Sequence, residues 1–393
     1  MDLLNFVKEK EARMIQIRRD LHQIPELELN LPKTMKYIEG VLDESGIKYT
    51  KLLNGNAIVA EIEGETPSNK CFAIRTDCDA LPIKEDTGLP FASTNGCMHA
   101  CGHDGHTAMA LCAAMVLNEH RDLFSGKVKI LFQPAEEIPG GALPMIQEGA
   151  LDGVDCIIGC HEGILMDIPI GKIGLHKGAL MASTDVFEIW IDGKNAHGAA
   201  PHLGVDPIVC ASELVLALQS IHSREISPLD KMVLTIGMLQ SGTAHNIIAD
   251  SVYLKGTVRT LDENLRQFVA KRIHELTENI AKSHRCTSRI NYDFSYPVLV
   301  NDADFTQFVH DTIVENLGED SVYWIENPTM GAEDMAYYLQ KVPGTFYMLC
   351  NPKVHDDGTI YPHHHAKFDI DEALMHKSVV AFVACAINYL SKE

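Results

Sequence analysis

Apolar residues at intervals of three and four predict two helices at the start of the chain. This pattern covers residues 6–21 and 33–42. Two strand-like runs follow within residues 47–62, and the pair Asn54-Gly55 separates them. Because Asn-Gly supplies the positive φ angles of a tight turn, these runs are expected to form a hairpin.

Short, nearly continuous apolar runs, separated by helical stretches, occupy the next part of the chain. They lie at residues 71–74, 128–132 and 156–158. Such runs are typical of central strands in a parallel sheet that helices cover on both faces. The first 180 residues are therefore expected to form α/β layers.

After Met181 the pattern changes to alternating strands and amphipathic helices. The expected order is strand, helix, strand, strand, helix, strand, at residues 185–191, 207–221, 232–239, 251–260, 265–283 and 288–294. This is the order of a ferredoxin-like split βαβ unit. From about residue 302 the α/β pattern returns. The predicted fold class is therefore α/β, with a discontinuous domain at residues 1–180 and 296–393 and an inserted domain at residues 181–295.

Length, charge and composition narrow the class of protein. A chain of 393 residues exceeds one ordinary core, which agrees with two domains. The formal charge of −21 argues against nucleic acid and anionic membranes as partners, because both would repel the protein. No uninterrupted apolar run reaches the roughly 18 to 20 residues of a membrane span, since Asn388 interrupts the last one. The charged N-terminus lacks a signal-peptide pattern, so a cytoplasmic location and reduced cysteines are expected.

The densest cluster of ligand-type side chains lies at residues 99–106, which read H-A-C-G-H-D-G-H. Three histidines, a cysteine and an aspartate within eight residues predict a metal site. An apolar helical stretch follows at residues 107–117. The cluster is therefore expected at the end of an α/β layer, where open parallel sheets bind ligands.

Further ligand-type residues come directly after the other expected strands, and three more histidines lie in the C-terminal region. The full set is Asp77 with Asp79, Cys101 with His103, Glu136 with Glu137, His161, and His363 to His365. The carboxyl ends of neighbouring parallel strands meet at one edge of a sheet, so these residues are expected to converge. A zinc-like ion takes about four ligands, and this set suits two ions about 3.5 to 4 Å apart. The thiolate and imidazoles favour zinc over magnesium or calcium.

The adjacent carboxylates of Glu136 and Glu137 would repel each other unless a cation separates their roles. One of them could bind metal while the other accepts a proton from water. Divalent ions lower the pKa of bound water from 15.7 toward about 7, so a carboxylate can generate hydroxide at neutral pH. The pair therefore indicates metal-dependent hydrolysis with a general base.

Two assignments stay open at the level of residue types. Asp77 and Asp79 either orient the metal ligands or cap the turn that follows them. His363, His364 and His365 are equivalent candidates for the late metal ligand. Neither choice affects the prediction of a two-metal site.

Four motifs resemble those of the M20 peptidase family. They are R-T-D-C-D-A-L-P at 75–82, M-H-A-C-G-H-D-G-H-T at 98–107, Q-P-A-E-E at 133–137 and G-A-E-D at 331–334. The resemblance is closest to the M20D-like amidohydrolase subgroup, which includes aminoacylases, hippurate hydrolases and auxin-conjugate hydrolases. It covers nearly the whole chain and implies a zinc-peptidase-like catalytic domain.

The resemblance also implies roles for individual residues of the catalytic domain. The implied metal ligands are Cys101, His103, Glu137, His161 and one late histidine, and the implied general base is Glu136. The late ligand of the family lies in a pattern like H-x-P-x-F, which here reads H-H-A-K-F with Ala366 in place of proline. His364 is therefore favoured, with His363 and His365 as alternatives.

The inserted domain resembles the lid of this family, which also mediates dimerisation, so a homodimer is expected. The segment A-H-G-A-A-P-H at 196–202 matches a lid segment in which His197 helps to polarise the scissile carbonyl, in some relatives across the dimer. Asn246 and Arg259 resemble substrate-binding positions. Arg259 suits pairing with a substrate carboxylate through two parallel hydrogen bonds. The alternative interpretations are a turn residue for Asn246 and a surface strand charge for Arg259.

The expected activity is hydrolysis of the amide bond of N-acyl amino acids that carry an N-acetyl or aromatic acyl group. The products would be a carboxylic acid and a free amino acid. A dipeptidase or carboxypeptidase of the same family is the alternative activity, and a catalytically silent binding homologue is the alternative class. Two divalent metal ions are the expected cofactor, with zinc first and manganese, cobalt or nickel as alternatives.

Overall fold

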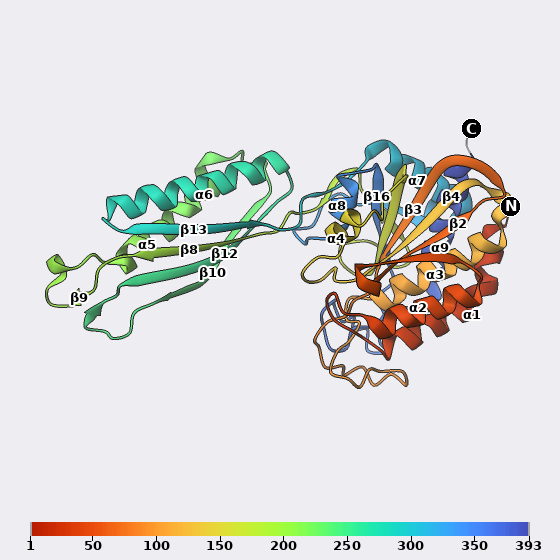
Figure 1. The fold of residues 1–393 in the computed structure, drawn as a ribbon, viewed down its shortest axis with the longest axis horizontal. Helices are drawn as coiled ribbons and strands as arrows, with labels where there is room; N and C mark the ends of the chain where they lie inside the picture. The colour runs from red at the N-terminus through yellow and green to blue at the C-terminus, as the bar shows by residue number, and fades with distance from the viewer. Residues whose placement is uncertain (1, 392–393) are drawn as a thin grey trace. The chain divides into compact units, whose positions relative to one another are not determined.

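The computed structural model describes residues 2–391, which form two compact units. The first unit contains the residues up to Gly178, Val300–Asn327 and the residues from Asp334 onward (Figure 1). The second unit contains Ala179–Leu299 and Pro328–Glu333. Residues 328–333, which the sequence pattern assigned to the outer domain, therefore group with the second unit.

A mixed sheet of eight strands forms the centre of the first unit. Its strands are β1 Lys48–Leu52, β2 Ala57–Glu63, β3 Thr66–Asp77, β4 Ser125–Gln133, β5 Cys156–Gly163, β6 Ile173–Leu175, β15 Val322–Trp324 and β16 Gly344–Cys350. They are ordered β1-β2-β4-β3-β5-β16-β6-β15. The central strands β4, β3, β5 and β16 are parallel, whereas β1, β2 and β6 add antiparallel pairings. The predicted α/β class is confirmed, with a mixed sheet.

The predicted hairpin lies at one edge of this sheet. Strand β1 pairs antiparallel with β2 and opposes Lys48 to Glu61. Between them, Asn54 and Gly55 have φ angles of 56° and 91°. These positive values are the ones that Asn and Gly tolerate best, so the local sequence explains the turn.

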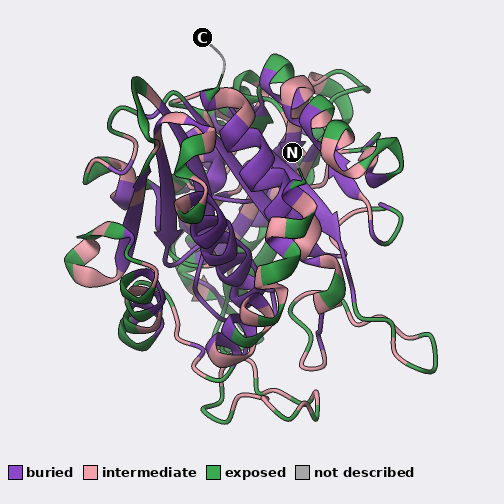
Figure 2. Ribbon diagram, turned by 90° about the vertical axis from the view of Figure 1, so that its right-hand side faces the viewer, coloured by how far each residue is buried: buried purple, intermediate pink, exposed green. Residues whose placement is uncertain are grey.

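Residues of the long helices and of the sheet form the main apolar core of the first unit. Figure 2 shows helical and strand segments that are buried along much of their length. The helices of this unit are α1 Leu3–His22, α2 Pro32–Glu44, α3 His103–Glu119, α4 Ala142–Gln147, α7 Ala303–Leu317, α8 Met335–Leu339 and α9 His376–Leu390. All residues of α3 from His103 to Leu117 are buried, as expected for a helix that packs around its whole circumference. Because α3 begins within the histidine-rich motif, this packing fixes the motif inside the protein.

The stretch Glu372–Leu390 has the length and apolar composition of a membrane span. The expectation that no apolar stretch reaches this length is wrong, because this stretch passes through Asn388 and extends to Leu390. However, 67% of its most apolar window is buried in the protein. Helix α9 contacts α1, α3 and α7 and belongs to the core of the first unit.

The second unit contains an antiparallel sheet of four strands ordered β10-β12-β8-β13. Its elements are β8 Asp185–Asp192, β9 Ala196–His197, α5 Pro207–Ser220, β10 Met232–Ser241, β11 Ile247–Ile248, β12 Ser251–Thr260, α6 Glu263–Ser283 and β13 Thr287–Phe294. Apolar residues alternate along β12, and those that point inward meet α5 and α6 in a separate core. Strands β7 Gly178–Met181 and β14 Leu299–Asn301 lie where the chain passes from one unit to the other.

Candidate metal centre

Three parallel strands and one helix bring the ligand-type residues of the first unit together. Strand β3 ends at Asp77 and β4 ends at Gln133, and these two residues are partners across the ladder. Strand β5, on the other side of β3, carries His161 near its carboxyl end. Helix α3 begins at His103. Residues far apart in the sequence therefore share one edge of the sheet, as expected for parallel strands.

Four overlapping groups of potential ligands lie at this edge, with the ligand atoms of each group within 4.8 Å of one another. The groups are Cys101, His103 and His161; Asp77, His103 and His106; Cys101, Glu137 and His364; and His103, Glu136 and Glu137. Each of the five ligands expected from the sequence belongs to at least one group. Cys101, His103 and Glu137 each belong to more than one, as expected for a site that holds two neighbouring ions.

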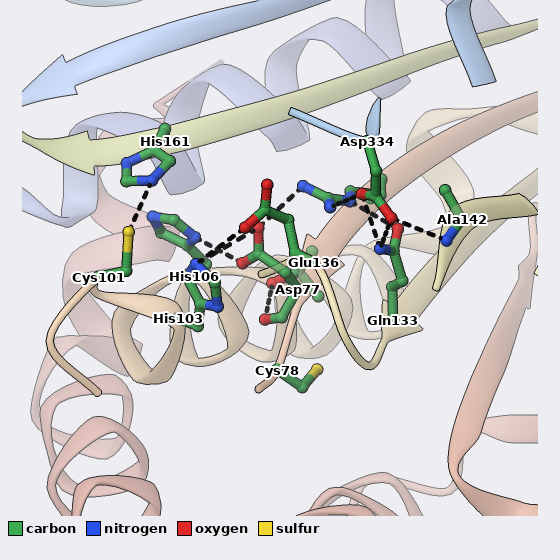
Figure 3. A network of polar contacts seen from close by, with 12 residues as sticks. Asp77, Cys78, Cys101, His103, His106, Gln133, Glu136, Ala142, His161 and Asp334 are labelled. Carbon is green, nitrogen blue, oxygen red and sulfur yellow. Dashed lines mark hydrogen bonds and ion pairs between the residues drawn. The ribbon is translucent and has the colours of Figure 1, made fainter. Parts of the chain in front are cut away.

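The Cys101 thiol and the His161 imidazole face each other in the buried part of the site (Figure 3). The Cys101 Sγ atom lies 3.4 Å from Nε2 of His161. Nδ1 of His161 lies 2.8 Å from the backbone oxygen of Glu162. Because a carbonyl only accepts, Nδ1 carries the proton and the lone pair of Nε2 faces the sulfur. Burial holds the pKa of His161 well below its usual value, which favours the neutral imidazole that binds metals.

His103 is 1% exposed, and among the described residues neither of its ring nitrogens makes a well-directed hydrogen bond. Its Nδ1 atom lies 3.4 Å from Asp79, and its Nε2 atom lies 3.9 Å from Asp77. A buried imidazole with only these loose contacts leaves hydrogen-bonding capacity unused, which is costly. A cation bound to this imidazole would remove that cost.

Asp79 holds the turn that carries the two adjacent glutamates. Its carboxylate accepts the backbone N–H of Glu136 at 2.9 Å and that of Glu137 at 3.1 Å. The two glutamate side chains approach different imidazoles. Oε1 of Glu137 lies 3.1 Å from Nε2 of His364, and Oε2 of Glu136 lies 4.0 Å from Nε2 of His103. Of the two roles left open by the sequence, these contacts favour the one in which Asp79 orients residues of the site over the one in which it caps the turn after β3.

Asp77 has its own buried partners, which are His106 (Figure 3) and Arg75. Its Oδ1 atom accepts from Nδ1 of His106 at 2.6 Å, and its Oδ2 atom accepts from Nη1 of Arg75 at 2.8 Å. Although burial opposes ionisation, His103, His106 and Arg75 hold the pKa of Asp77 well below its usual value. Nε2 of His106 accepts the backbone N–H of Glu162 at 2.9 Å. Both nitrogens of His106 are therefore occupied, which excludes it as a ligand in this arrangement.

The role of Asp334 is one that sequence reasoning missed. Its buried carboxylate accepts from the side chains of Arg75 and Gln133, each at 2.8 Å. It also accepts the backbone N–H groups of Gly141 at 3.0 Å and of Ala142 at 2.9 Å (Figure 3). The G-A-E-D motif is the only signal for this residue in the sequence. The fold brings it to the ends of β3 and β4, where it supports the strands that carry the site.

The three consecutive late histidines have different surroundings. His364 has a φ angle of 62°, and its side chain is half-exposed next to Glu137. Nε2 of His363 instead accepts a backbone N–H at 3.1 Å, and the ring of His365 stacks on a tyrosine. Among the described residues, His364 is the one of the three that shares a ligand group with Cys101 and Glu137.

The donor set fits divalent ions of borderline hardness. It comprises one thiol, three imidazoles and one carboxylate, from the five residues expected as ligands. Zinc sites in proteins use the same sulfur, nitrogen and oxygen ligands. Nε2 of His103 is buried without a well-directed hydrogen bond in the part of the chain that is described. Oε1 of Glu137 lies 3.1 Å from Nε2 of His364, so the two groups could share one cation.

The three remaining candidate residues lie in the second unit. Strand β9 pairs with β11, and the N–H of Gly198 donates to the backbone oxygen of Asn246 at 2.7 Å. His197 and Asn246 are therefore neighbours, and both are exposed. Arg259 lies on β12, half-buried, and its Nη1 donates to the backbone oxygen of Met330 at 3.1 Å. The structure brings together two of these three residues within this unit.

Comparisons with known proteins cover nearly the whole chain. Residues 73–388 match the family model described as Peptidase family M20/M25/M40. N-acetyl-L-cysteine deacetylase of Bacillus subtilis (strain 168) is 42% identical over 370 residues, which cover 94% of this chain and 86% of that protein. Thermostable carboxypeptidase 1 of Saccharolobus solfataricus is 37% identical over 395 residues, which cover 99% and 98%.

A solved structure extends the likeness to three dimensions. It is the crystal structure of a Bacillus subtilis protein described as a dinuclear metal binding peptidase from M20 family. Its TM-score is 0.85 at 36% sequence identity, and the match covers 98% of this chain and 100% of that chain. The similarity therefore includes both units.

Proposed function

Because the chain belongs to peptidase family M20/M25/M40, we propose that the ligand groups of its first unit hold two divalent ions that serve the hydrolysis of N-acyl amino acids. The products are a carboxylic acid and a free amino acid. The observation that carries the proposal is the convergence of five donor side chains beside Glu136. The 42% identity to a protein named N-acetyl-L-cysteine deacetylase supports the substrate class.

Two of the four groups consist only of the five proposed ligands, and these two groups share Cys101. Cys101 groups with His103 and His161 on one side and with Glu137 and His364 on the other. Zinc is the first choice of metal because thiolate and imidazole are borderline ligands, with manganese, cobalt and nickel as alternatives. When bound, the ions would lower the pKa of water toward about 7 and polarise the substrate carbonyl.

Glu136 is the proposed general base and acid. It accepts a proton from the attacking water and returns it to the leaving amine. Its side chain is 9% exposed and lies beside His103, while Asp79 fixes its backbone N–H. A positioned acid–base group of this kind typically contributes about 10² to 10⁴ in rate.

The second unit is proposed to be an inserted lid domain. Its element order β8-α5-β10-β12-α6-β13, with β8 and β12 central in the sheet, is that of a ferredoxin-like unit and supports this assignment. In this proposal His197 polarises the substrate carbonyl, from the same subunit or across a dimer. Asn246 and Arg259 bind the substrate, and the guanidinium pairs with the carboxylate of the amino acid. Closure of the lid would separate the bound substrate and the attacking water from bulk solvent.

The same unit supports a homodimer. Strand β10 lies at the edge of its sheet, so one side of its backbone has no strand partner among the described residues. Met238 and Leu239 on β10 are 42% and 50% exposed, and Leu216 on the adjacent α5 is 74% exposed. An open strand edge beside exposed apolar side chains favours association with a second copy. We propose a homodimer formed through this unit, located in the cytoplasm.

A carboxypeptidase or dipeptidase activity is the second candidate. The 37% identity to a thermostable carboxypeptidase over nearly the whole chain favours it. The same metal centre would serve both activities, because each hydrolyses an amide bond next to a free carboxylate. The two activities differ in the group on the carbonyl side of the scissile bond. This group is an acyl group in an N-acyl amino acid and an amino-acid residue in a peptide.

A substrate panel tests the proposal. Metal-free protein would be reconstituted with zinc, manganese, cobalt or nickel and assayed on N-acetyl amino acids, N-benzoyl amino acids and dipeptides. The proposed function predicts turnover of N-acyl amino acids that depends on added metal and disappears in Glu136→Gln. Turnover of dipeptides alone would favour the second candidate, and metal-independent turnover would contradict both.

A further inference from the structure

A buried ionic cluster lies behind the ligand-bearing segments, and the proposed hydrolysis uses none of its residues directly. Its centre is Arg18 on α1, whose side chain is 2% exposed. Nε of Arg18 donates to Asp104 at 2.9 Å, and Nη2 donates to Asp369 at 2.9 Å. Nη1 donates to Glu372 at 3.0 Å. A single guanidinium therefore holds three carboxylates from two distant parts of the chain.

The carboxylates lie close in sequence to proposed metal ligands. Asp104 follows His103 directly in the first turn of α3. Asp369 lies five residues after His364 in the same segment. The backbone N–H of His364 donates to the backbone oxygen of Ala100 at 2.8 Å. The segment with Cys101 and the segment with His364 are therefore joined directly by this backbone hydrogen bond and indirectly through the side chain of Arg18.

A second residue of α1 extends the cluster to the loop after β3. Nδ1 of His22 lies 2.8 Å from Asp104, and its Nε2 atom lies 3.2 Å from Glu85. The side chains of His22 and Glu85 are 0% and 1% exposed. Helix α1 thus contacts three segments that surround the candidate metal centre, although it supplies none of the proposed ligands.

Stability alone is a weak explanation for this cluster. Burial of several charges costs desolvation energy that their attraction often only balances, so buried ion pairs are frequently replaceable by apolar residues without loss. Buried charges are retained in some proteins because they specify one arrangement of their surroundings. Here the charges join two ligand-bearing segments.

We propose that Arg18 is a positioning residue of the metal centre. It holds the segment with Cys101 and His103 at a fixed separation from the segment with His364, so that Cys101 and His364 both reach the ion beside Glu137. The proposal rests on the proposed two-metal centre. A lysine at position 18 would keep the charge, but its single ammonium group cannot reproduce the planar contacts to three carboxylates.

Metal binding by Arg18→Met and Arg18→Lys tests this inference without an activity assay. Metal-free protein would be titrated with Zn²⁺ against a competing chelator, and the Co²⁺-loaded protein would be examined for the thiolate absorption band of Cys101. Arg18→Met is expected to weaken the binding of one of the two ions by about 10-fold. This is the lower end of the range for losing a group that hydrogen-bonds a ligand, because Arg18 acts on the ligands only through the segments that Asp104 and Asp369 anchor. The Co²⁺ band should weaken or shift, and Arg18→Lys should recover only part of the affinity.

Arg266→Met is the matched control for loss of a buried guanidinium. Arg266 is 4% exposed and bonds to Asp185 at 2.6 Å within the second unit. The variant Arg266→Met should lower the thermal stability of the protein and leave its affinities for both zinc ions unchanged. Arg19→Met is a second control, because Arg19 lies next to Arg18 but contacts only Glu372 of the three carboxylates.

The outcomes separate this inference from the proposed function. Unchanged zinc affinities and an unchanged Co²⁺ band in Arg18→Met, with two ions bound by the parent protein, would overturn the role of Arg18. Equal loss of affinity in Arg18→Met and Arg266→Met would also overturn it, as general destabilisation. A parent protein that binds fewer than two ions would contradict the proposed function instead. Should Arg18→Met not fold, Asp369→Asn keeps the side-chain shape and carries the same prediction.

Discussion

Sγ of Cys101 and Nε2 of His161 lie 3.4 Å apart, although 60 residues separate them in the chain. The contact joins the segment before α3 to the end of β5. A thiol and an imidazole lone pair directed at each other form half of a tetrahedral metal site. The proposed metal centre is built around this pair.

Cys101→Ala is expected to lower the amount of bound metal. Cys101 belongs to both ligand sets, so its loss affects each ion. Elemental analysis of the purified, metal-reconstituted variant should give fewer than two ions per chain. Cys97→Ala is the control, because Cys97 is partly exposed and belongs to none of the ligand groups found among the described residues. Full two-ion occupancy in Cys101→Ala would remove Cys101 from the ligand set.

Glu136→Gln should keep its metal and lose turnover by about 10² to 10⁴. The amide keeps the size of the side chain but cannot accept the proton of water. Glu137→Gln should instead lose metal, since the Glu137 carboxylate groups with Cys101 and His364. Steady-state kinetics and metal content of both variants would be compared. Near-normal turnover in Glu136→Gln contradicts its assignment as the base.

His197→Ala should lower kcat by about 10² to 10³, the usual cost of losing one stabilising group for the developing oxyanion. His197 lies in the second unit and in none of the ligand groups, so metal content should stay at two ions. Kinetics with a saturating N-acetyl amino acid provide the measurement. If kcat and KM are both unaltered, His197 takes no part in the reaction.

His22 should make the free energy of unfolding depend on pH. Although burial opposes it, Asp104 and Glu85 raise the pKa of His22 from 6.5 to about 9. Because the folded-state pKa is the higher one, this stabilisation is complete below pH 6.5 and is lost as pH rises through 9. Its size is about 3 kcal/mol.

The variant His22→Asn isolates this contribution from that of other titrating groups. Denaturant unfolding of parent and variant at about pH 6 and about pH 9.5 gives the two differences in stability. The difference should be larger at the lower pH. Equal differences at both pH values would show that His22 is not charged in the folded protein.

Local patterns in the sequence were sufficient for several elements of the first unit but gave no sign of β6, β15 or α4. The continuous apolar runs gave β3, β4 and β5 because strands buried on both faces need apolar residues at every position. Asn54-Gly55 located the first hairpin through its backbone preference. The ligand-type residues were recognisable because sulfur, imidazole and carboxylate groups rarely cluster without a chemical reason.

Contacts between distant segments could not be predicted from those local patterns. Asp334 reads as an ordinary acidic residue, and only the fold shows that it accepts from Arg75 and from the start of α4. Arg18 reads as one of many charges on an amphipathic helix, yet it is among the largest fully buried side chains. The surroundings of His363 and His364 likewise depend on a backbone turn that residue types do not encode. Each of these cases requires knowledge of which segments pack together.

Anomalous X-ray scattering from crystals of the zinc-loaded protein, recorded at the zinc absorption edge, tests the central claim most directly. The account predicts two peaks about 3.5 to 4 Å apart, contacted by the five ligands Cys101, His103, Glu137, His161 and His364. A single peak, or peaks remote from Cys101 and His161, would contradict it.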